Sequence, residues 1–312
     1  MGRSIASPGG YRLGQIHIDV ARNSTDDFNP FHDPQRYAKI RGNPYPRPIA
    51  LGFQVECLCA YLVDRLRETT DEDALADALG LTSRSFQFGF AGAVLRDEPF
   101  DVEVKGTVRR GDPPSLSNRV VVKSGGRAVL LGRVVDRQVP MHTLGADLVP
   151  LGDLRAAADR AYVGRSGYFL KRKFLSNANA KNFLTGSLVD QSHYFDETAE
   201  RVRFPELFPC ALASCALLEK ARSEGHDFMV NPLVYIAHAI SIDRRLARAL
   251  RSNDVLHTLV RGPLAVERPR GLGGPELRVQ RFECLGSLAG ERLLYRAELD
   301  LAPLRAIIAP TP

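Results

Sequence analysis

The chain has 312 residues, of which 44% are hydrophobic and 25% are charged, as expected for a globular protein large enough for two hydrophobic cores. No apolar run reaches the roughly 20 residues that cross a bilayer, and no apolar stretch of a signal peptide follows Met1. The net charge of +6 comes without a zinc-finger or RNA-binding signature, so we expect neither a nucleic-acid partner nor a membrane span. The five cysteines lack zinc-ligand spacing, so we expect buried free thiols, no metal site and a cytoplasmic protein.

The first informative segments in chain order lie near the N-terminus. The run Gln15–Ala21 comes first, and the family resemblance given below implies that it forms a strand. The string Asp27-Phe28-Asn29-Pro30-Phe31-His32 follows, in which Asn29-Pro30 predicts a turn and His32–Ile40 a short helix. Across such a turn the side chains of Asp27 and His32 can point the same way. The sequence therefore predicts a carboxylate–imidazole pair, the kind of pair that transfers protons.

Two apolar segments predict central helices that are surrounded by other structure. The first runs from Ile49 to Leu66 and the second from Cys210 to Ala221, and each comes just after a proline. Placing Pro48 on Pro209 gives an offset of 161 residues. That offset sets His193 at the position of His32 and Ala213 at the position of Gly52, which indicates an internal repeat.

Strand-like runs follow each predicted helix. They are Ser85–Phe90, Phe100–Val108, Ser117–Lys123 and Ala128–Gln138 in the first half, and Tyr235–Ile242, Val255–Val260, Glu276–Leu285 and Arg292–Leu301 in the second. One helix followed by several strands, twice, predicts an α+β protein with antiparallel sheet. We expect two domains, 1–145 and 165–312, with a short polar helix near Asp153–Ala161 in the seam between them.

The string Asp27-x-Asn29-Pro30-x-His32, with Pro48-Ile49-x-x-Gly52 downstream, resembles the hydratase motif of the MaoC-like (R)-specific enoyl-CoA hydratase/dehydratase family. The resemblance covers about residues 11–138, including Phe86–Val104, which is similar to the strand and hairpin that line the family's acyl tunnel. The second half is covered only through the repeat. The resemblance implies an α+β double hot-dog fold with two antiparallel sheets, each wrapping a central helix.

The resemblance also implies a lyase of fatty acid or polyketide metabolism that hydrates a 2-enoyl thioester, or dehydrates a 3-hydroxyacyl thioester, on coenzyme A or an acyl carrier protein. No metal or redox cofactor is implied. Asp27 and His32 would supply acid–base catalysis, and the backbone N–H of Gly52 would bind the thioester carbonyl. The implied substrate-binding residues are Asn29, Arg47, Leu51 and Phe53.

Two residues depart from the family's pattern. Leu51 stands where the family usually has His, and Asp26 stands where a glycine commonly precedes the motif aspartate, which would add a charge beside the base. In the second half Leu188 takes the position of Asp27, so we expect a non-catalytic second domain and one site per chain. Such a chain could act as a monomeric pseudo-dimer or as a homodimer.

Two alternatives remain open at this point. The first is a hot-dog thioesterase or acyltransferase that acts on acyl-CoA or on an acyl carrier protein. The second is a non-catalytic hot-dog protein that binds acyl chains, since one fold hosts several functions.

Overall fold

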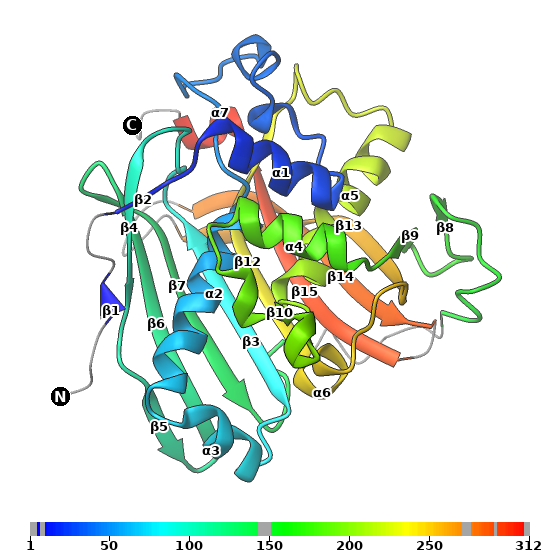
Figure 1. The fold of residues 1–312 in the computed structure, drawn as a ribbon. Coiled ribbons are helices and arrows are strands. Elements are labelled where there is room, and N and C mark those ends of the chain that lie inside the picture. Colours follow the sequence, from blue (N-terminus) through cyan, green and yellow to red (C-terminus); the bar gives the residue numbers. More distant parts are fainter. Residues whose placement is uncertain (1–4, 7–9, 143–150, 270–275, 290–291, 309–312) are drawn as a thin grey trace.

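A computed structural model describes residues 5–6, 10–142, 151–269, 276–289 and 292–308 (Figure 1). Within these ranges no helix combines the length and the apolar character that a membrane crossing requires. The elements of the first half are β1 (Ile5–Ala6), β2 (Tyr11–Arg12), α1 (Gln15–Thr25), the 3₁₀ turns η1 (Pro30–His32) and η2 (Tyr37–Lys39), α2 (Gly52–Glu68), α3 (Glu72–Ala78), β3 (Ser83–Phe90), β4 (Pro99–Val104), β5 (Val108–Gly111), β6 (Pro114–Ser124) and β7 (Arg127–Arg137).

The second half repeats much of this order. Its elements are β8 (Ala161–Tyr162), β9 (Phe169–Phe174), α4 (Asn177–Gly186), η3 (Gln191–His193), β10 (Phe195–Asp196), η4 (Glu197–Ala199), β11 (Arg201–Val202), α5 (Leu207–Ser223), β12 (Leu233–Asp243), α6 (Arg244–Arg248), β13 (Val255–Pro269), β14 (Glu276–Leu288), β15 (Arg292–Pro303) and α7 (Leu304–Ile308). The division into domains 1–145 and 165–312 stays a prediction.

Three local predictions are wrong. Gln15–Ala21 lies in helix α1 instead of a strand, and α1 packs closely on α4, where a Cβ on Gly186 would come within 2.8 Å of Ala21. His32–Ile40 forms two short 3₁₀ turns and not one helix. Asp153–Ala161 contains turns but no helix. In each case tertiary packing or turn geometry, and not the local sequence pattern, determines the structure of the segment.

All described strands except the small pair β10 and β11 form one continuous sheet, so the expectation of two sheets, each wrapping a central helix, is wrong. Thirteen described strands share it, in the path β1-β4-β6-β7-β3-β12-β15-β14-β13-β9-β8, with β2 and β5 on side branches. The two halves join where β3 pairs antiparallel with β12, from Gly89 opposite Ala237 to Ser83 opposite Asp243. This pairing satisfies backbone groups that two separate sheets would leave at open edges.

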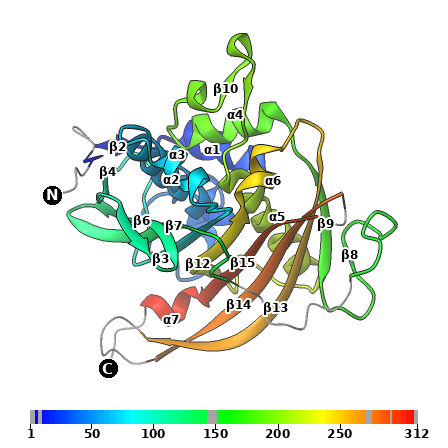
Figure 2. The same ribbon diagram turned by 90° about the horizontal axis from the view of Figure 1, so that it is seen from below.

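Helices α2 and α5 lie against the same side of the curved sheet, with α1 and α4 beyond them (Figure 2). Both central helices are buried on nearly all sides, as their apolar sequences predicted. Gln54 of α2 is fully buried and donates to the carbonyl oxygens of His17 in α1 and Gly186 in α4. One side chain thus ties three helices together.

The repeat is confirmed for the turns, but its offset is wrong for the helices. Turns η1 and η3 are 161 residues apart, and Asn29 and Asp190 cap them alike by accepting a backbone N–H two residues on. Helices α2 and α5 are both 17 residues long, yet they start at Gly52 and Leu207, only 155 residues apart. Gly52 therefore corresponds to Leu207 and not to Ala213, because Pro209 is the third residue of its helix whereas Pro48 precedes α2.

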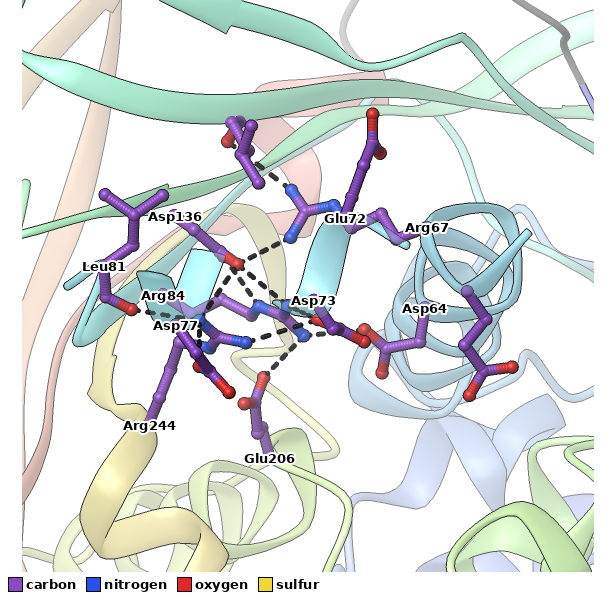
Figure 3. Close-up of polar contacts among 12 residues, drawn as sticks. Asp64, Arg67, Glu72, Asp73, Asp77, Leu81, Arg84, Asp136, Glu206 and Arg244 are labelled. Atoms are coloured by element: carbon purple, nitrogen blue, oxygen red, sulfur yellow. Dashed lines mark hydrogen bonds and ion pairs between the residues drawn. The ribbon is translucent and has the colours of Figure 1, made fainter. Parts of the chain in front are cut away.

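A buried network of ion pairs holds the C-terminal end of α2 (Figure 3). The carboxylate of Asp136 accepts from Arg67 Nη1 at 2.6 Å and from Arg84 Nε at 2.8 Å, and all three side chains are almost fully buried. Arg84 also donates to Asp64 at 2.7 Å and to Glu206 at 3.1 Å. Burial alone would raise the pKa of Asp136, but the charges of Arg84 and Arg67 hold that pKa well below its usual range.

Candidate functional site

The motif aspartate sits where α1 ends. Asp26 takes a left-handed conformation with φ of 53°, which Asp tolerates better than most residues, and the N–H of Asp27 then donates to Arg22 O at 2.8 Å. The carboxylate of Asp27 accepts the N–H of Asn29 at 2.9 Å in an Asx turn. This places a buried carboxylate directly before turn η1.

His32 ends turn η1, and its ring has a defined tautomer. Nδ1 lies 2.8 Å from the carbonyl oxygen of Ile49. Because a carbonyl oxygen can only accept, Nδ1 carries the proton in this bond, and a neutral ring keeps its lone pair on Nε2. Only 5% of His32 is exposed. The imidazole is therefore a fixed proton acceptor at the turn.

Gly52 starts helix α2 beside His32. The N–H of Ala50 donates to Val94 O at 2.9 Å and the N–H of Leu51 bonds to the side chain of Gln54 at 3.3 Å, whereas no partner for the Gly52 N–H is recorded within the described ranges. The first amides of a helix have no intrahelical acceptor and carry partial positive charge. A Cβ at Gly52 would lie 2.9 Å from Phe90 Cζ, so the position favours glycine. The helix start is thus an open donor for an oxygen atom.

An apolar cavity of about 150 Å³ lies beside these groups. Asn29, His32, Leu51 and Gly52 line it, whereas Asp27 is not among its lining residues in the described chain. The remaining lining residues are almost all apolar: Phe31, Tyr45, Ile49, Ala50, Val55, Phe90, Ala91, Gly92, Ala93, Val94, Val129, Leu130, Leu233, Val234, Tyr235, Ile236 and Ile307. The arrangement can hold a short apolar group with an electronegative atom at the start of α2.

Two expected substrate-binding residues lie elsewhere, and Asp26 does not crowd the site. Arg47 is exposed and donates to Arg96 O at 3.2 Å, outside the cavity lining. Phe53 is buried behind the cavity, stacked on His238 at 4.5 Å between ring centroids. The carboxylate of Asp26 is 71% exposed and pairs with Lys173, so its charge is directed to the surface.

The sequence did not assign four residues to the site: Tyr235, Ser214, His238 and Glu56. Tyr235 lines the cavity, and its hydroxyl lies 2.9 Å from Ser214 Oγ on α5. Behind Gly52, His238 Nδ1 lies 2.8 Å from Glu56 Oε1, and both side chains are fully buried. The spacing of Glu56 four residues after Gly52 was visible in the sequence, but the pairing of β12 with β3 that brings in the others was not.

The equivalent place in the second half is built differently. Leu188 replaces the motif aspartate, and His193 Nδ1 lies 3.3 Å from Glu68 Oε1 at the far end of α2. The residue before α5 is Glu206, whose carboxylate is bound by Arg84. An acidic side chain paired with arginine thus occupies the helix start that Gly52 leaves open in the first half.

No protein-family model and no curated protein matches the chain. Solved structures match over nearly its whole length. RV0216, a conserved hypothetical protein from Mycobacterium tuberculosis with a double hot-dog fold, is 12% identical with a TM-score of 0.59, over 96% of this chain and 95% of that one. A MaoC-like dehydratase is 12% identical with a TM-score of 0.56, over 96% and 97%. A putative MaoC domain protein dehydratase from Chloroflexus aurantiacus is 9% identical with a TM-score of 0.56, over 97% and 95%. Likeness at these identities establishes the fold, and the chain has the expected α+β double hot-dog fold.

Proposed function

We propose that the chain is a lyase that reversibly adds water to a 2-enoyl thioester, giving a 3-hydroxyacyl thioester. The observation that carries the proposal is the placement of His32 and of the open N–H of Gly52 on one apolar cavity, with the buried carboxylate of Asp27 in the turn that leads to His32. The fold likeness to proteins named as MaoC-like dehydratases supports the same reading.

Each group has a place in that reaction. Asp27 and His32 hold the water, take one proton from it as its oxygen bonds to C3, and return one proton to C2. Negative charge builds up on the thioester oxygen between these steps, and the N–H of Gly52 at the positive end of α2 stabilises it. One water is consumed and no electrons are exchanged with a cofactor, so the residues present suffice for the step.

The cavity favours a short acyl group. Its volume of about 150 Å³ is similar to that of engineered apolar cavities that hold one benzene molecule. We propose that the acyl end enters it past Ala91 and Val94, with the thioester at Gly52 and the carrier, coenzyme A or an acyl carrier protein, outside.

The proposal is tested by offering purified protein a panel of 2-enoyl and 3-hydroxyacyl thioesters of increasing chain length on both carriers. Mass spectrometry of the products should show gain or loss of one water, with the highest kcat/KM for the shortest chains. Release of free thiol and free acid without hydration would favour the thioesterase alternative. Binding of acyl thioesters with no product of either kind would favour the non-catalytic alternative.

A further inference from the structure

The second half of the chain sends one polar side chain into the cavity of the first half. Tyr235, at the start of β12, lines the cavity together with Asn29, His32 and Gly52. It is the only tyrosine from the second half among the cavity-lining residues of the described chain. A tyrosine side chain from the other half of the fold therefore lines the same cavity as Asn29, His32 and Gly52.

A backbone irregularity directs Tyr235 there. Along β12 and β15, Tyr235 pairs with Leu301 but Ala237 pairs with Asp300, so Ile236 is an extra residue on one strand. Such a bulge breaks the alternation of side chains and turns neighbouring residues to one face, and bulges are common next to active sites. Both Tyr235 and Ile236 consequently line the cavity.

The hydroxyl of Tyr235 is anchored and stays protonated. Ser214 Oγ, itself only 3% exposed, lies 2.9 Å from it. When Ser214 donates in this bond, the phenolic proton is free for a second acceptor. Burial, with a further contribution from the nearby charge of Asp27, raises the pKa of Tyr235 above its usual value. The group is therefore a proton-bearing donor at neutral pH.

We propose that Tyr235 is a further catalytic residue of the hydratase site, beside Asp27, His32 and Gly52, which donates a hydrogen bond to the oxygen atom that Asp27 and His32 hold, the attacking water or the 3-hydroxyl group. Ser214 is its positioning residue. The inference rests on the proposed function, and it assigns the second half a part in catalysis beyond completing the sheet.

The test is Tyr235→Phe, which keeps the ring and removes only the hydroxyl. We expect kcat on the best enoyl thioester to fall roughly 10- to 100-fold, the effect of one hydrogen bond to a polar transition state, with KM little changed. Ser214→Ala should give a smaller loss in the same parameter. Tyr295→Phe is the matched control, because Tyr295 is buried in the same half but lies outside this cavity.

A double mutant separates catalysis from mere packing. If Tyr235 and Asp27 act on one oxygen atom, Tyr235→Phe should cause little further loss in an Asp27→Asn background. A full additional loss there, or a Tyr235→Phe enzyme that matches Tyr295→Phe in kcat, would overturn the role of Tyr235 while the hydratase function stands. A wild type that turns over no thioester of the panel would overturn the proposed function and this role with it.

Discussion

Replacing Asp136 by Asn probes the buried ion network at the C-terminal end of α2. The change keeps the shape of the side chain but removes the negative charge that Arg67 and Arg84 share. Arg84 would retain Asp64 and Glu206, whereas Arg67 would retain only the neutral acceptors Asn118 and Leu116 O. The mutant thus leaves the fully buried guanidinium group of Arg67 without a charged hydrogen-bond partner among the described residues.

The expected cost follows from that burial. Removing one partner of a buried ion pair destabilises a protein by about 3–5 kcal/mol. At about 2 °C per kcal/mol for a chain of this size, Tm should fall by about 6–10 °C. Glu197→Gln is the control, because the Glu197 side chain is 54% exposed and its surface pair with Lys181, outside the network, should contribute little to stability.

Thermal unfolding followed by circular dichroism measures both variants at neutral pH. Activity should be retained well below Tm, since Arg67 lies fifteen residues along α2 from Gly52, or about 22 Å at 1.5 Å per residue. If Asp136→Asn and Glu197→Gln unfolded within a degree of each other, the reasoning about the network would be refuted.

Two further predictions concern the helix start and acid stability. In Gly52→Ala the new Cβ would lie 2.9 Å from Phe90 Cζ, so the amide or the ring must move. We expect kcat, measured by steady-state kinetics, to fall roughly 10²-fold, the cost of one oxyanion donor. Adding Phe90→Leu to Gly52→Ala should restore part of the lost kcat. Burial would raise the pKa values of Asp64 and Asp136, but the charges of nearby arginines outweigh it and lower both pKa values in the folded chain. The two carboxylates therefore bind protons more readily in the unfolded chain. Their contribution to stability is full above the unfolded carboxylate pKa of about 4 and is lost as pH falls below it. Urea unfolding between neutral and acid pH should show this fall, and a flat profile would contradict it.

The parts of the fold that the sequence predicted depend on contacts close in the chain. The apolar runs at Ile49–Leu66 and Cys210–Ala221 overlap α2 and α5, because helices buried on nearly all sides need apolar residues at nearly every position. The strand that the resemblance implied at Gln15–Ala21 is wrong, because this segment forms helix α1, which buries one side against α4. The prolines gave the wrong helix register, since proline is tolerated both before a helix and in its first turn.

The candidate site divides in the same way. Asp27 and Asn29 are linked by bonds within one turn, so their proximity could be predicted from spacing. Tyr235 reaches the cavity only because β12 pairs with β3, a contact between residues about 150 positions apart. No local pattern predicts the register of that pairing.

The central claim is that Asp27 performs proton transfer at this cavity, and its neighbour offers a matched control. Asp26→Asn changes the same charge at an exposed position paired with Lys173, whereas Asp27→Asn changes it at the buried turn. On the best enoyl thioester, Asp27→Asn should lose water addition by roughly 10²- to 10⁴-fold, while Asp26→Asn stays near the wild-type rate and both remain folded. An Asp27→Asn protein that hydrates the substrate as fast as Asp26→Asn would contradict the account.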